Sequence, residues 1–220
     1  MSSSSAAPVG GTTRKGSRTR EQILEAAARL FAERGYEGTG IRDIEDAAGV
    51  NRGVVTYHFG NKDAVWKAMF SYVCLPYIED LRSKTDLLRA LEPKVRVRLL
   101  IENFVRMSAR RPELNQLMIQ ENFRSTWRSR WIVEHLLEPM RTLNLSIGDG
   151  DQALTLLERD PHVRYALLGA CNMPFSLPSE VRAMFGQDVY DEAFVQRHVD
   201  TVTRIFEGAL GQAGGEEEHV

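Results

Sequence analysis

The chain has 220 residues, of which 43% are hydrophobic and 26% charged, and its formal net charge is −2. This is the composition of an ordinary globular protein that is long enough to bury a real core. No apolar run reaches the roughly 18 residues of a membrane span, and the N-terminal stretch lacks the pattern of a secretory signal. Because Cys74 and Cys171 lie far apart and no metal-binding spacing of Cys and His occurs, we expect no disulfide framework, no metal, no cofactor and a cytoplasmic location.

Positive charge gathers near the N-terminus. Residues 1–67 carry ten Lys and Arg against eight Asp and Glu, whereas the rest of the chain is acidic overall. Residues 1–20 contain four basic side chains and no acidic one, which suits a polyanionic partner, although a solvated tail explains the pattern equally well. Because they are poor in large apolar side chains, residues 1–17 and 212–220 are expected to be disordered tails.

The first predicted helix begins near Thr19. This residue is a good N-cap, and Gln22 stands three positions later as the reciprocal partner of a capping box. Gly35 then ends the helix as a C-cap glycine does. Five apolar residues share one face and predict a core-facing stripe: Ile23, Leu24, Ala27, Leu30 and Phe31.

Two short helices and a longer one follow. The pattern predicts a helix over 41–48 that stops at Gly49, and a second helix that begins after an Asn51 cap and runs to about Phe59. Asn61 caps the next helix, and Asp63 lies at the favourable end of its dipole. Short helices joined by a tight turn of this kind form the helix-turn-helix that presents its second helix to a major groove.

The remainder of the chain is predicted to be helical as well, with no convincing strand. Pro93, Pro112 and the pair Asp160–Pro161 mark helix starts, and a helix over about 126–145 should kink at Pro139. A final helix spans about 191–210. The sequence therefore predicts an all-α fold, with a three-helix DNA-binding domain over 18–65 and a helical bundle over 66–211.

The outward face of the second short helix carries the candidate chemistry. If Val55 and Phe59 face the core, then Tyr57 and His58 lie outward, where their polar hydrogens can reach phosphate oxygens. Lys62 adds a charge at a helix N-terminus that already favours anions.

At this point the sequence resembles a known family. Residues 19–70 resemble the N-terminal domain of the TetR family of bacterial transcription repressors, through the segments TREQILEAAARLFAERGYEGT, IRDIEDAAGV and NRGVVTYHFGNKDAVW. The stretch RYALLGACNMPFSLP is similar to C-terminal domains of some members. The resemblance implies a homodimer that binds double-stranded DNA at a palindromic operator and is released by a small molecule, without enzymatic activity.

The resemblance also implies roles for individual residues. It implies that Arg42 can contact a base or a phosphate. The start of the recognition helix, where base edges are read, is formed by Arg52, Gly53 and Val54. The residues implied to contact phosphates are Tyr57, His58 and Lys62. Two positions depart from the common pattern, because many relatives have Thr in place of Gly40 and Tyr in place of Thr56. The full expected DNA-contacting set is Thr39, Gly40, Arg42, Arg52, Gly53, Val54, Thr56, Tyr57, His58 and Lys62.

The second half of the chain is expected to hold a ligand pocket and the dimer surface. For each proposed lining residue, an ordinary core position is the alternative explanation. The expected lining consists of Phe104, Met107, Met118, Glu121, Asn122, Trp127, Trp131, Tyr165, Asn172 and Phe175. The dimer surface is expected over about 160–173 and 191–210, at Val163, Leu167, Val199, Val202 and Phe206.

Two residues in this half invite opposite interpretations. Glu121 lies in an apolar helix, where a buried carboxylate needs a partner. It either pairs with a nearby arginine (Arg124, Arg128 or Arg130) or faces the pocket and favours a cationic or hydrogen-bonding ligand. Cys171 sits among apolar residues and is expected to be an inert buried thiol.

Other functional classes remain open at this level. An all-helical enzyme that uses the C-terminal cavity has no visible nucleophile–base pair, phosphate loop or metal spacing to support it. An activator or a nucleoid-type DNA binder has the same fold and differs in gene output or in sequence selectivity.

Overall fold

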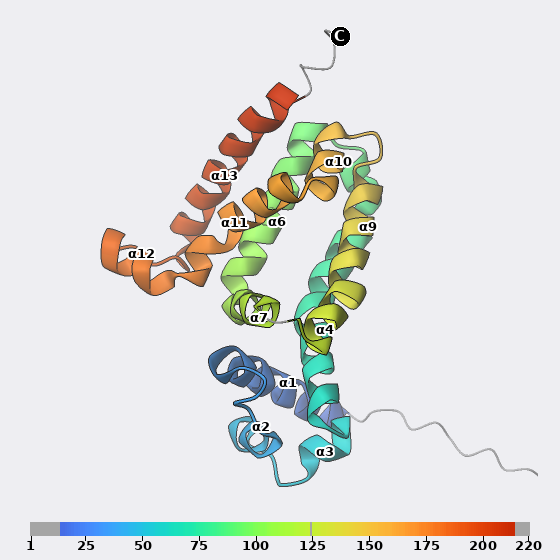
Figure 1. Cartoon of the computed structure of the whole chain (residues 1–220), viewed down its shortest axis with the longest axis vertical. Coiled ribbons are helices and arrows are strands. Elements are labelled where there is room, and N and C mark those ends of the chain that lie inside the picture. Colours follow the sequence, from blue (N-terminus) through green and yellow to red (C-terminus); the bar gives the residue numbers. More distant parts are fainter. Residues whose placement is uncertain (1–13, 124, 214–220) are drawn as a thin grey trace, which may run out of the picture. The chain divides into compact units, whose positions relative to one another are not determined.

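The computed structural model describes residues 14–123 and 125–213, and every regular element in these ranges is helical (Figure 1). The chain forms two compact units that divide between Tyr72 and Val73, within one helix. The first unit contains α1 (Arg14–Arg34), α2 (Ile41–Ala48), α3 (Val54–Phe59) and the first part of α4 (Lys62–Ser83). The second contains the rest of α4, α5 (Thr85–Arg89), α6 (Pro93–Arg110), α7 (Pro112–Asn122), α8 (Trp127–Ile132), a π-helical turn (Val133–Leu137), α9 (Glu138–Ile147), α10 (Gln152–Arg159), α11 (Pro161–Ser176), α12 (Pro178–Phe185) and α13 (Glu192–Ala213). The predicted all-α fold is confirmed.

Helix α1 starts earlier than its sequence predicts. It begins at Arg14 rather than near Thr19, so Thr19 lies inside the helix and is not its N-cap. The helix can extend because no proline interrupts the preceding turn, and Ser17 donates a hydrogen bond to Glu21 one turn later, at 3.2 Å. Residues 14–17 are therefore helical, and the rest of the expected N-terminal tail lies outside the described residues.

The predicted inner face of α1 forms the core of the first unit. All five of its apolar residues are buried, together with Ile44 of α2 and Val55 of α3. From α4, Trp66 and Phe70 add two fully buried rings, which pack at a tilt of 45° with their centroids 4.4 Å apart. Burying side chains of this size contributes about 1.5–3 kcal/mol each. Because α4 supplies part of this core, the first unit extends past residue 65, where the sequence places the domain boundary.

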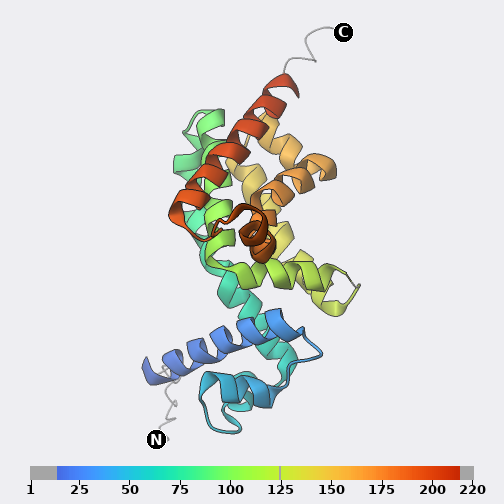
Figure 2. The ribbon, with the colours of Figure 1, turned by 90° about the vertical axis from the view of Figure 1, so that its left-hand side faces the viewer.

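Three helices form the main core of the second unit. Helices α6, α11 and α13 pack on one another, and Figures 1 and 2 show them side by side. Their inner faces contribute one continuous apolar cluster, in which Val105, Phe175 and Val199 are fully buried. Alternation of apolar and polar residues at helical spacing accounts for this arrangement.

A buried ion pair closes one end of this unit. Arg96 of α6 donates to the Asp151 carboxylate at 2.8 Å, and both side chains are less than a tenth exposed. The same guanidinium donates to the carbonyl oxygens of Leu88, Arg89 and Leu91, at 2.9, 3.1 and 2.8 Å. Arg96 thus satisfies the carbonyls at the end of α5 and ties them to the residue that caps α10.

The helix predicted over about 126–145 forms as one continuous helical stretch, in which α8, the π-helical turn and α9 follow one another without a break. The irregularity expected at Pro139 takes the form of the π-helical turn just before it, and Pro139 itself lies in the first turn of α9. The cap at Asp160 is confirmed too, since its carboxylate accepts the N–H groups of His162 and Val163 at 2.7 and 3.3 Å.

Candidate functional site

The turn between α2 and α3 is built on two left-handed glycines and one buried acid. Gly49 ends α2 with φ of 65°, and Gly53 precedes α3 with φ of 87°, a backbone region that residues with a Cβ avoid. Glu45 of α2 is 2% exposed, and its carboxylate accepts the N–H of Gly53 at 2.7 Å. The expected cap at Asn51 is therefore wrong: α3 begins at Val54, and Glu45 provides the carboxylate at this helix start.

Arg52 folds back over this turn. Its guanidinium donates to the Arg42 carbonyl oxygen and to the Asp46 carboxylate, both at 3.0 Å, and lies 3.6 Å from the Glu45 carboxylate. Its side chain remains 57% exposed. In this structure Arg52 fastens α2 to the start of α3, which differs from the base-reading role expected for it.

The outer face of α3 is open. Tyr57 is 85% exposed, and its ring meets the edge of His58, with the centroids 5.3 Å apart. Val55 points into the core as predicted, while Phe59 is half-buried beneath the guanidinium of Arg20, at 5.2 Å. Beside this face lies a shallow hollow, which is lined by Ile41, Arg42, Glu45, Arg52, Gly53 and Thr56.

Lys62 is held at the start of α4 by an aromatic ring. Its ammonium lies 4.1 Å from the ring centroid of Tyr36, whose hydroxyl donates to the Asp63 carboxylate. Asn61 caps the helix as predicted, since its side-chain oxygen accepts the N–H of Ala64 at 2.9 Å. A cation over a ring keeps its charge and loses freedom of movement, so Lys62 is oriented without being neutralised.

Thr39 and Gly40 take structural positions. Thr39 is 1% exposed, and its hydroxyl donates to the carbonyls of Leu30 and Gly35 at 3.1 and 2.9 Å, so its side chain does not offer the DNA contact that was expected. The N–H of Gly40 donates to the Asp43 carboxylate at 2.7 Å. A Cβ on Gly40 would come within 3.0 Å of that carboxylate, so a larger residue here would need the Asp43 side chain to shift.

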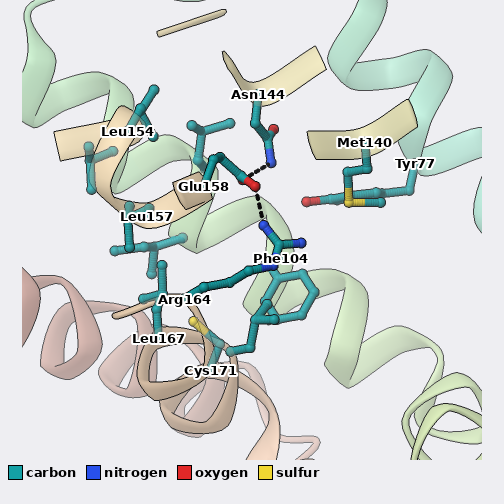
Figure 3. A pocket seen from close by; sticks show the side chains of 14 residues that line it. Tyr77, Phe104, Met140, Asn144, Leu154, Leu157, Glu158, Arg164, Leu167 and Cys171 are labelled. Carbon is teal, nitrogen blue, oxygen red and sulfur yellow. Dashed lines mark hydrogen bonds and ion pairs between the residues drawn. The ribbon is translucent and has the colours of Figure 1, made fainter. Parts of the chain in front are cut away.

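The second unit contains a small, mostly apolar cavity of about 90 Å³ (Figure 3). Its polar side is made by Glu158, whose carboxylate accepts a hydrogen bond from Asn144 at 2.7 Å and another from Arg164. Burial raises the pKa of the Glu158 carboxyl above its ordinary value, against the opposing effects of Asn144 and Arg164. The lining residues are Tyr77, Val97, Leu100, Ile101, Phe104, Met140, Asn144, Leu154, Leu157, Glu158, Arg164, Leu167, Leu168 and Cys171.

Of the ten expected lining residues, the cavity includes only Phe104. Glu121 is buried in an ion pair with Arg128, whose Nε lies 2.9 and 2.8 Å from its two oxygens, so the pairing interpretation is confirmed. Phe175 belongs to the core, and Tyr165 is 65% exposed. The remaining six do not line this cavity: Met107, Met118, Asn122, Trp127, Trp131 and Asn172.

The residues that the sequence analysis missed carry a recognisable signal. Glu158 and Arg164 stand on either side of the Asp160–Pro161 helix start, an acid that directly follows the stretch ALTLL and a base that directly precedes YALL. Aromatic and methionine positions indicate burial, but they do not tell which buried face meets a cavity. An acid–base pair across a helix junction is the better indicator, because such charges are buried only when they are paired.

The expected dimer residues point into their own subunit. Val199, Val202 and Phe206 are 0, 2 and 7% exposed and belong to the core of the second unit, while Leu167 lines the cavity and Val163 packs against the core. This correction arises because the apolar stripe of α13 packs on α6 of the same chain. Among the side chains of α11 and α13 whose burial the structure describes, the large apolar ones that are exposed are others: Tyr165, Met173 and Ile205.

Both cysteines are buried thiols. Burial raises the pKa of Cys74 and of Cys171 to about 12, so little thiolate forms at neutral pH. Within residues 14–123 and 125–213, no group of three or more His, Cys, Asp and Glu side chains is arranged to hold a metal ion. No helix in those ranges is both long and apolar enough to cross a membrane.

Comparison with known proteins identifies the first unit. Residues 23–69 match the family described as bacterial regulatory proteins, tetR family. The transcriptional repressor AcnR of Corynebacterium efficiens is 47% identical over 51 residues, which cover 23% of this chain and 27% of that relative. The transcriptional repressor Rv3405c of Mycobacterium tuberculosis is 35% identical over 124 residues, covering 52% of this chain and 66% of that protein.

The similarity to solved structures extends further along the chain. The transcriptional regulator FadR of Bacillus subtilis, solved in complex with stearoyl-CoA, aligns with a TM-score of 0.61 over 83% of this chain and 97% of its own. At 18% identity, this likeness concerns the fold alone. The match to the AcnR relatives spans only about a quarter of their length.

Proposed function

The chain belongs to the TetR family of bacterial regulatory proteins, and from this premise we propose that it is a sequence-specific DNA-binding transcription regulator, a repressor that a small molecule releases from its operator. The single observation that carries the proposal is the exposed face of α3. There Tyr57 is 85% exposed on a short helix, beside a hollow that contains Arg42 and Thr56. On this face the exposed Tyr57 hydroxyl is placed to donate to a phosphate oxygen, next to an arginine and a threonine that can reach a groove.

Two kinds of DNA contact are assigned to this surface. Arg42 and Thr56 stand at the hollow and are proposed to read base edges in the major groove, with Val54 offering its methyl groups to a thymine. Tyr57, His58 and Lys62 are proposed to bind phosphates, which fix the register of the helix on the duplex. Gly53 and Arg52 stabilise the turn before α3, and we propose that they affect DNA binding by orienting α3 rather than by contacting DNA.

We propose a homodimer that uses the exposed apolar side chains of α11 and α13. Tyr165 and Met173 of α11 and Ile205 of α13 are 65, 50 and 58% exposed, although each is large and apolar. A two-fold symmetric dimer presents two recognition helices, and half-sites one helical turn apart, or a multiple of it, would be its matching operator. A protein that binds operator DNA in this way acts in the cytoplasm.

The cavity of the second unit is the proposed effector site. It is concave, mostly apolar and carries a few convergent polar groups, which is the usual character of a small-molecule site. The FadR neighbour, a regulator solved with stearoyl-CoA, supports a small-molecule effector for this chain. By linkage, a ligand that prefers a conformation with low operator affinity must release the DNA.

A titration of the full chain against duplex DNA from upstream of its own gene tests the proposal. Fluorescence anisotropy, recorded over a series of salt concentrations with random duplex as competitor, separates specific from non-specific binding. Tight binding that resists the competitor supports a specific regulator. Binding that random DNA removes equally at every salt concentration, on this DNA and on fragments selected from the genome, contradicts sequence-specific regulation and favours a nucleoid-type binder.

A further inference from the structure

The corner between α10 and α11 places one acid and one base in an apolar cavity. The side chains of Glu158 and Arg164 are 6 and 19% exposed, and they are paired with each other. Each Glu158 oxygen already accepts a hydrogen bond, one from Asn144 and one from Arg164. Both oxygens of this carboxylate therefore already accept from a donor of the protein.

Two donors on the same wall are not used. The Tyr77 hydroxyl points into the cavity towards the Glu158–Arg164 pair, and one nitrogen of the Arg164 guanidinium points away from Glu158 into the same space (Figure 3). Among the described residues, Arg164 donates only to Glu158, and the Tyr77 hydroxyl makes no hydrogen bond at all. Since buried donors normally find partners, these two groups favour a bound molecule that supplies an acceptor oxygen.

The charge balance selects an uncharged molecule. Glu158 and Arg164 neutralise one another, and the nearby Arg141 is paired with Glu138 at 3.1 Å. A ligand carboxylate would put a second negative charge beside Glu158, and a ligand ammonium would compete with Arg164 for the single carboxylate. Either would leave an uncompensated charge in a site where burial already disfavours the Glu158 carboxylate.

The cavity volume limits the size of the molecule. One buried water needs roughly 10–15 Å³ of such volume, so about 90 Å³ accommodates on the order of six to nine non-hydrogen atoms. Apart from Asn144, Glu158 and Arg164, the lining is aliphatic, aromatic or sulfur-containing. The non-polar part of the ligand therefore occupies most of the space.

We propose that this cavity binds a small, uncharged, largely apolar molecule with one carbonyl-type acceptor, such as a ketone, ester or lactone, held by the Tyr77 hydroxyl and Arg164. This inference rests on the proposed function where it treats the cavity as the effector site. The binding step itself requires no DNA and is measured without it.

The test compares three probes of matched length on the full chain at neutral pH: methyl pentyl ketone, heptanoate and heptylamine. Isothermal titration calorimetry should give a dissociation constant for the ketone at least about tenfold lower than for either charged probe, about 1.4 kcal/mol. If the ketone does not bind, or if heptanoate or heptylamine binds as tightly, the assignment is overturned.

Two variants examine the donors and the charge. Tyr77→Phe removes only the hydroxyl and should weaken ketone binding by about tenfold, while Tyr190→Phe, whose side chain does not line the cavity, should leave it unchanged. Glu158→Gln leaves Arg164 without its counter-charge, so it should increase the affinity for heptanoate. Unchanged ketone binding in Tyr77→Phe, or no gain of heptanoate binding in Glu158→Gln, contradicts the proposal.

The outcome is separable from that of the proposed function. A protein that binds the ketone but no operator retains the assigned ligand class and loses the regulatory role. A protein that binds a specific operator but not the ketone retains the regulatory role and loses the ligand class.

Discussion

Among the large apolar side chains of the described ranges, Tyr57 is the most exposed, and it shares its surface with a cation held over a ring. Lys62→Ala should weaken binding to every DNA sequence alike and reduce the salt slope by about one, because one phosphate contact is lost. Tyr57→Phe should weaken binding and leave the slope unchanged, since a hydroxyl carries no charge. The exposed Lys94 of the second unit gives the control variant, Lys94→Ala, for which neither affinity nor slope should change.

The two arginines at the hollow should behave differently. Arg42→Ala removes a side chain that is free to reach a base, so it should cost roughly 1–3 kcal/mol on the operator and relax preference at one base position. Arg52→Ala removes the fastening between Asp46, the Arg42 carbonyl and Glu45, so it should weaken operator and random DNA together and lower the thermal stability of the first unit. If Arg52→Ala instead loses preference at one base position of the operator, Arg52 contacts a base directly.

The thiols should be inert in the folded protein. Because the pKa of both Cys74 and Cys171 is raised to about 12 by burial, a disulfide reagent at neutral pH should modify neither before unfolding and both after it. Timed reaction with Ellman's reagent, with and without denaturant, gives the two counts. Rapid modification of a native thiol would show that its surroundings open.

At the scale of elements, buried Arg96 has the largest expected effect. Arg96→Met leaves the Asp151 charge and three carbonyls without their donor, so it should lower the free energy of unfolding of the second unit by about 3–5 kcal/mol. Arg98→Met, which breaks the more exposed pair with Asp200, should change stability little. Urea unfolding followed by circular dichroism compares the two, and equal losses would contradict the distinction.

Local signals predicted the helices well where the competing forces are local. The caps at Asn61 and Asp160 and the buried stripe of α1 follow from neighbours within one turn. The start of α1 and the cap of α3 do not follow from such neighbours. Helix α1 includes residues that precede Thr19, and the start of α3 depends on Glu45, a residue of another helix. Side chains that reach across from a neighbouring element are not visible in local sequence periodicity.

The stripe of α13 shows the same limit at larger scale. Its apolar face was predicted correctly as a buried surface, but periodicity does not say whether α6 of the same chain or a second subunit covers it. Packing assigns Val202 to the subunit's own core. The cavity was missed for a related reason, because its wall joins Tyr77, Asn144 and Glu158, which come from three different helices.

At the scale of the whole molecule, the dimer proposal distinguishes two neighbouring positions of α13. Ile205→Glu introduces a charge on an exposed face and should split the dimer while the helical content is kept. Val202→Glu places an unpaired charge in the core and should unfold the second unit instead. Analytical ultracentrifugation with circular dichroism reads both, and an unchanged sedimentation coefficient in Ile205→Glu would contradict the assigned surface.

Selection of duplex DNA from a random pool by the full chain tests sequence-specific binding most directly. We predict enrichment of an inverted repeat whose half-sites are one helical turn apart, about 10 base pairs, or a multiple of it. Tyr57→Ala should abolish that enrichment. A pool that remains random after repeated rounds, while the protein stays folded and dimeric, would contradict sequence-specific DNA binding.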